Sequence, residues 1–197
     1  ALGGLVFNVG NVAGAGLGLD ALLGLPPRWG GALSAAIAIG IFLSRRAGVA
    51  MDRVVVALGF LMIAMTGYVA VVSDPPLGRA LVNAERPESV DFLAITTLVG
   101  GTVGGYITYA GAHRLLDAGV QGPACVAEIA RASVIGVLLT ALMRVLLFLA
   151  VLGVVSSGVA LSPDNPAASA FAAAAGEAGL RLFGLILWAA ALTSVIG

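Results

Sequence analysis

Long apolar runs separated by short polar segments dominate the chain, and they predict a bundle of membrane-spanning helices. Each run is apolar on all sides rather than on one face, and together they cover residues 2–25, 29–43, 54–72, 92–116, 132–155 and 166–197. About 20 helical residues cross the hydrocarbon core of a bilayer, so 29–43 is short for a span. Strands of a membrane barrel would alternate polar and apolar residues, which these runs do not.

Composition supports a lipid environment. Hydrophobic residues make up 60% of the chain and charged residues 10%, whereas a soluble domain carries about 25% charged residues. The formal net charge is zero, which gives no indication of a nucleic-acid partner. The single cysteine, Cys125, excludes an internal disulfide. We therefore expect an all-α membrane protein whose main partner is the lipid bilayer.

The polar stretch 73–91 divides the predicted helices into two groups. Residues 1–72 hold three spans, 73–91 form a polar loop, and 92–197 hold three more. Both termini fall inside apolar runs, so we expect further N- and C-terminal helices of the same protein. The arginines between spans favour, by five to four, a cytoplasmic location for the N-terminal side of the first span. We expect a multi-pass protein of the bacterial inner membrane.

The fourth run carries the candidate chemistry. Gly100, Gly101, Gly104 and Gly105 lie within the sequence G-G-T-V-G-G, and each glycine costs a helix interior about 1 kcal/mol relative to alanine. A helix that unwinds here exposes backbone carbonyls, which are suitable ligands for hard divalent cations. The Thr102 hydroxyl adds another oxygen ligand. The alternative is close helix packing through glycines spaced four residues apart.

The first run shows a similar ambiguity. Gly10, Gly14 and Gly18 repeat at four-residue spacing and predict a packing face. Asn8 and Asn11 lie three residues apart on neighbouring positions of the same helix. Their amides either form hydrogen bonds between helices or line a transport pathway.

Arg144 is a charge near the centre of the fifth run. Insertion of an arginine there costs about 2.5–3.5 kcal/mol, so we expect a buried charge facing the bundle interior or a cavity. Snorkelling to the membrane surface is the alternative. Trp29 and Trp188 are candidate anchors at the membrane surface. No catalytic motif is visible, so we expect neither an enzyme nor a cofactor.

The order of the spans resembles the third to eighth helices of the NRAMP metal transporters, which have the LeuT-type inverted-repeat fold. The fourth run, G-G-T-V-G-G-Y, resembles the G-A-T-V-M-P-H pattern of the family's sixth helix, which is broken. The resemblance implies a broken helix near residues 100–106 and a metal bound by the Gly101 carbonyl. It also places Gly104 at the metal-binding methionine, Gly105 at the proline, and Tyr106 at a histidine linked to proton movement.

The departures from the family pattern imply a particular ion. Asn8 and Asn11 replace two acids of a proton route, and Gly104 replaces a soft thioether that favours transition metals. The chain is thus similar to the NRAMP-related magnesium transporters, which implies Mg²⁺ or Mn²⁺ as substrate without proton coupling. Gly101, Thr102 and Gly104 would bind metal, with Gly100, Gly105 and Tyr106 lining the cavity. The alternatives are a proton-coupled Mn²⁺/Fe²⁺ transporter, an amino-acid carrier of the same fold, and a membrane scaffold.

Overall fold

A computed structural model describes residues 2–43, 48–87, 89–102, 115–116, 119–120 and 122–196. Those residues are helical or lie in connecting turns and loops, with no strand among them. The helices, in chain order, are α1 (Leu2–Leu23), α2 (Pro27–Leu43), α3 (Gly48–Val72), α4 (Leu77–Glu85), α5 (Phe92–Thr102), the short 3₁₀ turn η1 (Pro123–Cys125), α8 (Val126–Ser156) and α9 (Pro166–Ile196). The prediction of an all-α membrane fold is confirmed.

The chain divides into two compact units. One unit, here called the packed unit, comprises Leu5–Pro75 and Met143–Gly197. It contains α2, α3, α9, nearly all of α1 and the C-terminal part of α8. The other unit comprises Ala1–Gly4 and Pro76–Leu142, and contains α4, α5 and the N-terminal part of α8.

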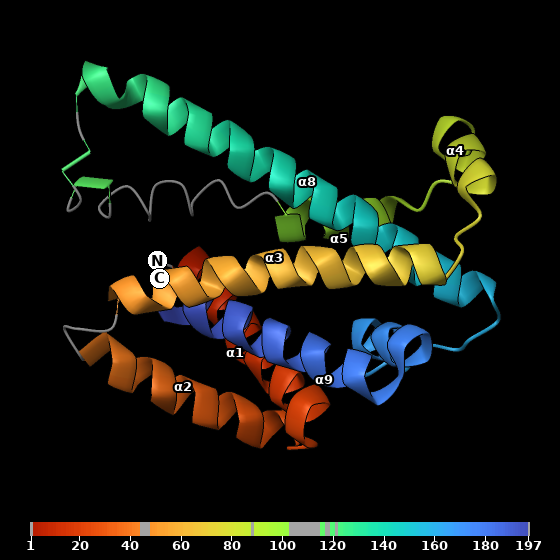
Figure 1. Cartoon of the computed structure of the whole chain (residues 1–197), viewed down its shortest axis with the longest axis horizontal. Coiled ribbons are helices and arrows are strands. Elements are labelled where there is room, and N and C mark those ends of the chain that lie inside the picture. Colours follow the sequence, from red (N-terminus) through yellow and green to blue (C-terminus); the bar gives the residue numbers. More distant parts are fainter. Residues whose placement is uncertain are drawn as a thin grey trace. The chain divides into compact units, whose positions relative to one another are not determined.

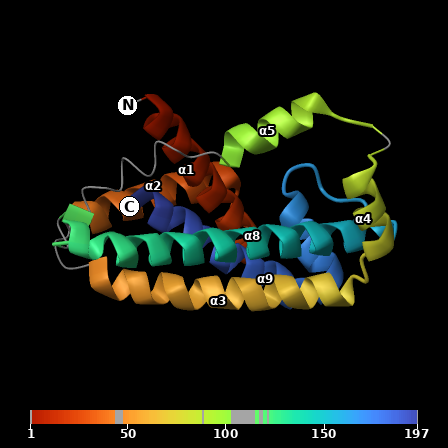
Figure 2. The ribbon, with the colours of Figure 1, turned by 90° about the horizontal axis from the view of Figure 1, so that it is seen from above.

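Helix α9 forms the centre of the packed unit and contacts both α2 and α3, between which it lies (Figure 1). Seen from above, α3 and α9 run side by side (Figure 2). An apolar core surrounds this contact and also includes residues of α1 and α8. Its buried members are Ala21, Val69, Ala70, Ala150, Ala168, Phe171 and Phe183. Burying such apolar side chains stabilises the unit by about 25 cal/mol per Å² removed from solvent.

A glycine divides α9 into a short lead and a longer segment. Gly176 has φ 62° and ψ −156°, a conformation outside the helical region that glycine adopts without a steric penalty. The chain changes direction there, and the lighter-blue lead diverges from the rest of α9 in Figure 1. The rings of Phe171 and Phe183, on either side of the break, lie 4.7 Å apart between centroids and are both buried. This aromatic contact holds the two segments together across the break.

The ends of α1 and α2 follow from local sequence signals. Gly24 adopts φ 70° just after α1, and its N–H donates to the Asp20 carbonyl at 2.7 Å, a common way to end a helix. Pro27 begins α2 at the first helical position, where a missing N–H costs nothing. The predicted division between the runs 2–25 and 29–43 therefore agrees with the end of α1 and the start of α2.

Three helices are long and apolar enough to cross a bilayer within the described residues, and the number rises to four if Val56–Val72 and α4 count together as one broken span. The three are Gly3–Leu23, Pro123–Ser156 and Pro166–Ile196. Helix α2 has 17 residues, which agrees with the short second run. Multiple apolar helices make this a multi-pass membrane protein.

One segment differs from the prediction. The stretch 73–91, expected to be a polar loop, contains the nine-residue helix α4. The sequence L-G-R-A-L-V-N-A-E supports a helix because its leucines and alanines recur at three- and four-residue spacing. The polar residues between them prevent a long apolar run, so the pattern of runs alone did not predict a helix here.

Candidate functional site

The predicted metal-binding sequence begins at the C-terminal end of α5. Asp91 caps this helix, since its Oδ1 accepts the Ala94 N–H at 2.9 Å. The helix continues without a break through Gly100, Gly101 and Thr102. Gly104, Gly105 and Tyr106 lie outside the described residues. Any unwinding of this span therefore starts after Thr102, and residues 100–102 of the predicted break are helical.

The two asparagines of α1 have different surroundings. Asn8 is exposed, whereas the Nδ2 atom of Asn11 is buried and has no hydrogen-bond partner among the described residues. Asn11 lies one turn before Gly14, and a Cβ added to Gly14 would lie 3.6 Å from the Cβ of Ala191 in α9. Asn11 thus belongs to the side of α1 that turns toward α9. Its amide can donate a hydrogen bond to water or another oxygen, but it cannot carry a proton at neutral pH.

The glycines of α1 allow close helix packing, as predicted for two of the three. Gly18 contacts the backbone of Gly184 and Trp188 in α9, and Gly14 contacts Ala191. Gly10 is exposed, and a Cβ added there would meet no atom within 4 Å. Gly16, on another side of α1, contacts the backbone of α2 instead. Of the three glycines spaced four residues apart, packing against α9 therefore starts at Gly14.

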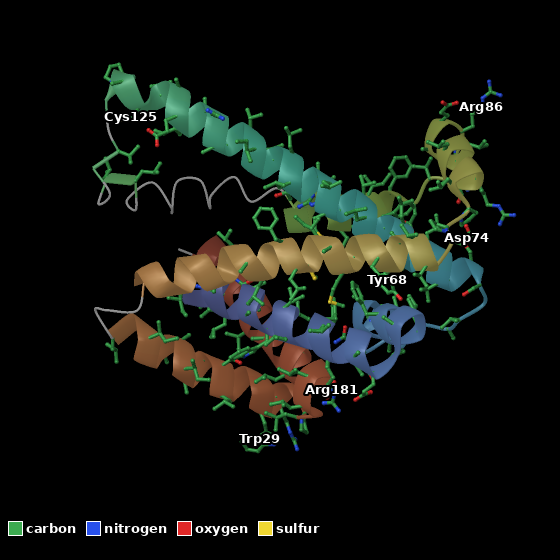
Figure 3. The ribbon with its side chains drawn as sticks, viewed as in Figure 1. Trp29, Tyr68, Asp74, Arg86, Cys125 and Arg181 are labelled. Atoms are coloured by element: carbon green, nitrogen blue, oxygen red, sulfur yellow. The ribbon has the colours of Figure 1, made fainter. Side chains whose placement is uncertain are left out.

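Polar contacts from α9 hold the C-terminal half of α1. Arg181 donates to the backbone carbonyl of Leu22 and pairs with Glu177 at 2.7 Å. Figure 3 shows Arg181 at this end of α1. A cation at a helix C-terminus interacts favourably with the exposed carbonyls. The Asn165 amide donates to the Leu17 carbonyl at 3.4 Å, and its Oδ1 accepts the Ala168 N–H at 3.2 Å.

These contacts were not predicted, although one local signal exists. Asn165 followed by Pro166 is the typical start of a helix, with a capping side chain and proline at the first helical position. Nothing in the sequence indicates that the same asparagine also reaches α1. Gly176 was likewise part of an Ala-rich run and gave no sign of a break.

Trp188 is an interhelical hydrogen-bond donor in this structure. Its Nε1 atom donates to Ser34 Oγ of α2 at 3.0 Å, and Ser34 donates in turn to the Gly30 carbonyl at 2.7 Å. Ser34 is fully buried. The indole N–H of Trp188 is thus satisfied by a neighbouring helix, and its role as an anchor at the membrane surface stays a prediction.

The expectation that Arg144 faces a bundle interior or a cavity stays a prediction. Its side chain is exposed on α8, whose buried residues are Ala150, Gly153 and Val154, closer to the C-terminal end. Among the described residues, few side chains pack against the part of α8 around Arg144. Thr66 on α3, in contrast, is fully buried. Its hydroxyl has no hydrogen-bond partner in the described part of the chain.

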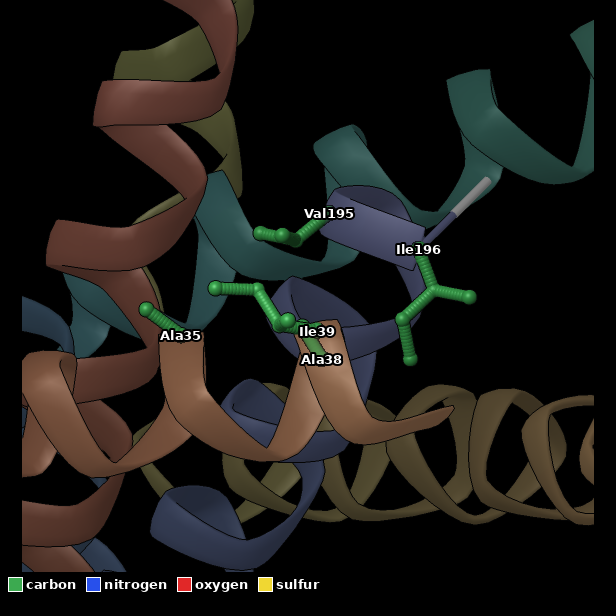
Figure 4. Close-up of a pocket in the computed structure, with 5 residues that line it drawn as sticks. All are labelled: Ala35, Ala38, Ile39, Val195 and Ile196. Carbon is green, nitrogen blue, oxygen red and sulfur yellow. The ribbon is translucent and has the colours of Figure 1, made fainter. Parts of the chain in front are cut away.

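Neither the side-chain clusters nor a hollow beside α2 suggests a conventional metal site in the described part of the chain. No group of three histidine, cysteine or acidic side chains close enough to hold a metal occurs in the parts of the chain that the structure describes. A hollow of about 280 Å³ opens between α2 and the end of α9, lined by Ala35, Ala38, Ile39, Val195 and Ile196 (Figure 4). Its lining offers aliphatic side chains and no side-chain oxygen ligand.

Comparisons with known proteins agree with the membrane fold. The Nramp family, described as natural resistance-associated macrophage protein-like, matches residues 1–197. A protein of Bacillus subtilis (strain 168) named "Uncharacterized membrane protein YcsG" is 56% identical over 196 residues, covering 100% of this chain and 48% of that protein. An "Uncharacterized membrane protein" of Haemophilus influenzae (strain ATCC 51907 / DSM 11121 / KW20 / Rd) is 55% identical, covering 100% of this chain and 49% of that protein.

The chain spans about half the length of these curated relatives. No solved structure matches it. The family match extends from the first residue to the last and includes both α1 and the glycine-rich end of α5. The chain belongs to the Nramp family.

Proposed function

We propose that this chain forms part of a transporter that carries divalent metal cations across the bacterial cell membrane. The observation that carries the proposal is the match of the whole chain to the Nramp family, together with several apolar helices of spanning length. The transport activity would be that of a protein as long as these relatives, of which the chain spans about half.

The cation would bind where α5 ends. Gly101 would offer its backbone carbonyl and Thr102 its hydroxyl, and Gly104 would leave space for water on the ion. Backbone and hydroxyl oxygens are hard ligands that suit Mg²⁺, which keeps several waters when bound. Gly100, Gly105 and Tyr106 would line the surrounding cavity. The position of Gly101 and Thr102 at the last described turn of α5 is compatible with a break just beyond it.

The preferred ion would be Mg²⁺, with Mn²⁺ as a second substrate, and transport would not be coupled to protons. Glycine at position 104 supplies no soft sulfur ligand, which removes a preference for transition metals. Asn8 and Asn11 are neutral, so this stretch of α1 has no carboxylate that could carry protons. The buried, unpartnered amide of Asn11 supports the view that the position remains polar without being ionisable.

The chain would contribute the last three helices of one inverted repeat and the first three of the next, in a LeuT-type fold. Within it, α1, α2 and α9 pack backbone to backbone at Gly16, Gly18 and Gly184. Close contacts of this kind resist deformation, since the interior of a protein is densely packed. We expect these helices to move as one rigid body during alternating access.

A membrane scaffold is the second candidate. The packing of Gly18 against Gly184 favours it, because glycines of α1 clearly serve helix association. This observation does not extend to the glycines of α5. A scaffold predicts that Gly101→Ala impairs assembly without a selective defect in transport.

Uptake by the full-length protein in proteoliposomes tests the proposal. Vesicles containing the protein should accumulate Mg²⁺ or Mn²⁺ faster than empty vesicles, and Gly101→Ala should slow uptake while the protein remains folded. Absence of uptake, combined with absence of thermal stabilisation by either cation, would favour the scaffold. Uptake of an amino acid in place of a metal would favour an organic substrate.

A further inference from the structure

Helix α4 gathers most of its apolar residues on one face, with Val82 as the exception. With 3.6 residues per turn, Leu77, Ala80, Leu81 and Ala84 share one face. Arg79 and Asn83 lie on the opposite side, and Arg86 directly follows the last residue of the helix. The long helices α1 and α8 differ, since apolar residues occur all round them. This pattern is typical of a helix between an apolar phase and water.

The apolar face of α4 has no cover among the described residues. No residue of the helix is buried, and Leu77 and Leu81 are 53% and 68% exposed. Leaving such side chains in water forgoes about 25 cal/mol for each Å² of apolar surface. Another apolar surface is therefore expected to cover this face.

The lipid bilayer is the apolar surface that lies near α4, because a predicted membrane span precedes the helix and another follows it. Helix α3 ends at Val72 and α5 begins at Phe92, so α4 lies in the connection between two predicted spans. Residues 73–76 reach at most about 14 Å when fully extended. The first turn of α4 is thus close to the membrane surface. Val71 and Phe92, at the neighbouring span ends, are 79% and 76% exposed, as expected for side chains that contact lipid.

Length and charge define how α4 meets the lipid. Nine residues extend about 14 Å as a helix, too short to cross the hydrocarbon core. The stretch 73–91 contains four acidic residues and two arginines, so it has no cationic excess that would attract anionic lipids. The interaction would depend on apolar burial alone, at a surface of zwitterionic lipid.

We propose that α4 is an interfacial helix, lying along the membrane surface with Leu77, Ala80, Leu81 and Ala84 in the lipid and Arg79, Asn83 and Arg86 in water. Figure 3 shows Arg86 at the C-terminal end of α4. The helix would fix the ends of α3 and α5 at a defined depth. This inference concerns the membrane surface and does not depend on which ion is carried.

Site-directed spin labelling of the full-length protein in phosphatidylcholine nanodiscs tests the proposal. Single cysteines replace Leu77, Leu81, Arg79 or Asn83 in a background that includes Cys125→Ser and has no other reactive cysteine. A nitroxide on each cysteine reports collisions with oxygen, which concentrates in lipid, and with a water-soluble nickel chelate. Val71→Cys, near the end of α3, is the matched control for a lipid-facing position in folded protein.

We expect the relative accessibility to oxygen and to the nickel chelate to alternate with the period of a helix. Labels at 77 and 81 should collide more with oxygen, as at 71, whereas labels at 79 and 83 should collide more with the nickel chelate. Equal access of the nickel chelate to all four positions would overturn the proposal. The proposal would also be overturned if neither reagent reached the labels at 77 and 81, because another protein segment would then cover the apolar face.

Discussion

The backbones of Gly18 in α1 and Gly184 in α9 lie in direct contact. A Cβ added to Gly18 would lie 2.9 Å from the Gly184 carbonyl oxygen, and one added to Gly184 would lie 2.7 Å from the Gly18 carbonyl oxygen. Real Cβ atoms do not approach backbone so closely, so any larger residue must separate the helices. This contact fixes the distance between α1 and α9 in the packed unit.

Gly184→Ala should therefore destabilise the protein. Overpacking of a tight contact costs about 1–3 kcal/mol, and the apparent melting temperature of the full-length protein in detergent should fall by several degrees. Gly10→Ala is the matched control, because Gly10 also lies in a helix, but a Cβ there meets no atom within 4 Å. A lower melting temperature for Gly10→Ala than for Gly184→Ala would show that the described packing is incorrect.

Ser34→Ala should leave the Trp188 indole N–H without an acceptor. The bond spans 3.0 Å between α9 and α2 at a buried serine. Interhelical hydrogen bonds in membrane proteins contribute about 0.6 kcal/mol on average and up to about 1.7 kcal/mol. A double-mutant cycle with Trp188→Phe, measured by thermal unfolding, should give a coupling energy in this range. Strict additivity of the two substitutions would contradict a direct interaction.

Arg181→Met should weaken the attachment of α9 to the end of α1. The guanidinium donates to the Leu22 carbonyl as well as to Glu177, so its loss leaves carbonyls at the helix end without a cation. Glu177→Gln is the control, because an exposed ion pair contributes about 0–1 kcal/mol. We expect Arg181→Met to lower the melting temperature more than Glu177→Gln. Equal effects would indicate that the Leu22 contact is unimportant.

Gly104→Met should change ion selectivity in the full-length transporter. A thioether is a soft ligand that favours Mn²⁺ over Mg²⁺ and occupies space that would otherwise hold water. The ratio of Mg²⁺ to Mn²⁺ uptake should fall about tenfold, equivalent to about 1.4 kcal/mol. Competition between the two ions in vesicles measures it. An unchanged ratio would remove Gly104 from the proposed site.

The long apolar runs predict most helices well because a bilayer imposes a simple requirement on length and polarity. The predicted run 29–43 agrees closely with α2, and the run 54–72 ends with α3 at Val72. Helix α4 was missed, since its nine residues are short and mix polar with apolar side chains. The break at Gly176 was also missed, because one glycine within an Ala-rich run is compatible with an unbroken helix.

Contacts between distant residues were predictable in kind but not in detail. The four-residue spacing of glycines correctly indicates a packing face at Gly14 and Gly18, yet it also includes Gly10, which has no neighbour. Which residue pairs meet depends on how α1 and α9 are aligned along each other. No local pattern encodes that alignment, so the Arg181–Leu22 and Trp188–Ser34 contacts require the structure.

The proposed function requires that the full-length protein move divalent cations without moving protons. The most direct measurement is Mg²⁺ and Mn²⁺ uptake into proteoliposomes, with the internal pH recorded in the same vesicles. Cations should accumulate inside the vesicles at constant internal pH. Internal acidification that depends on the metal gradient would contradict the proposed function, as would vesicles that take up neither ion although the protein is folded.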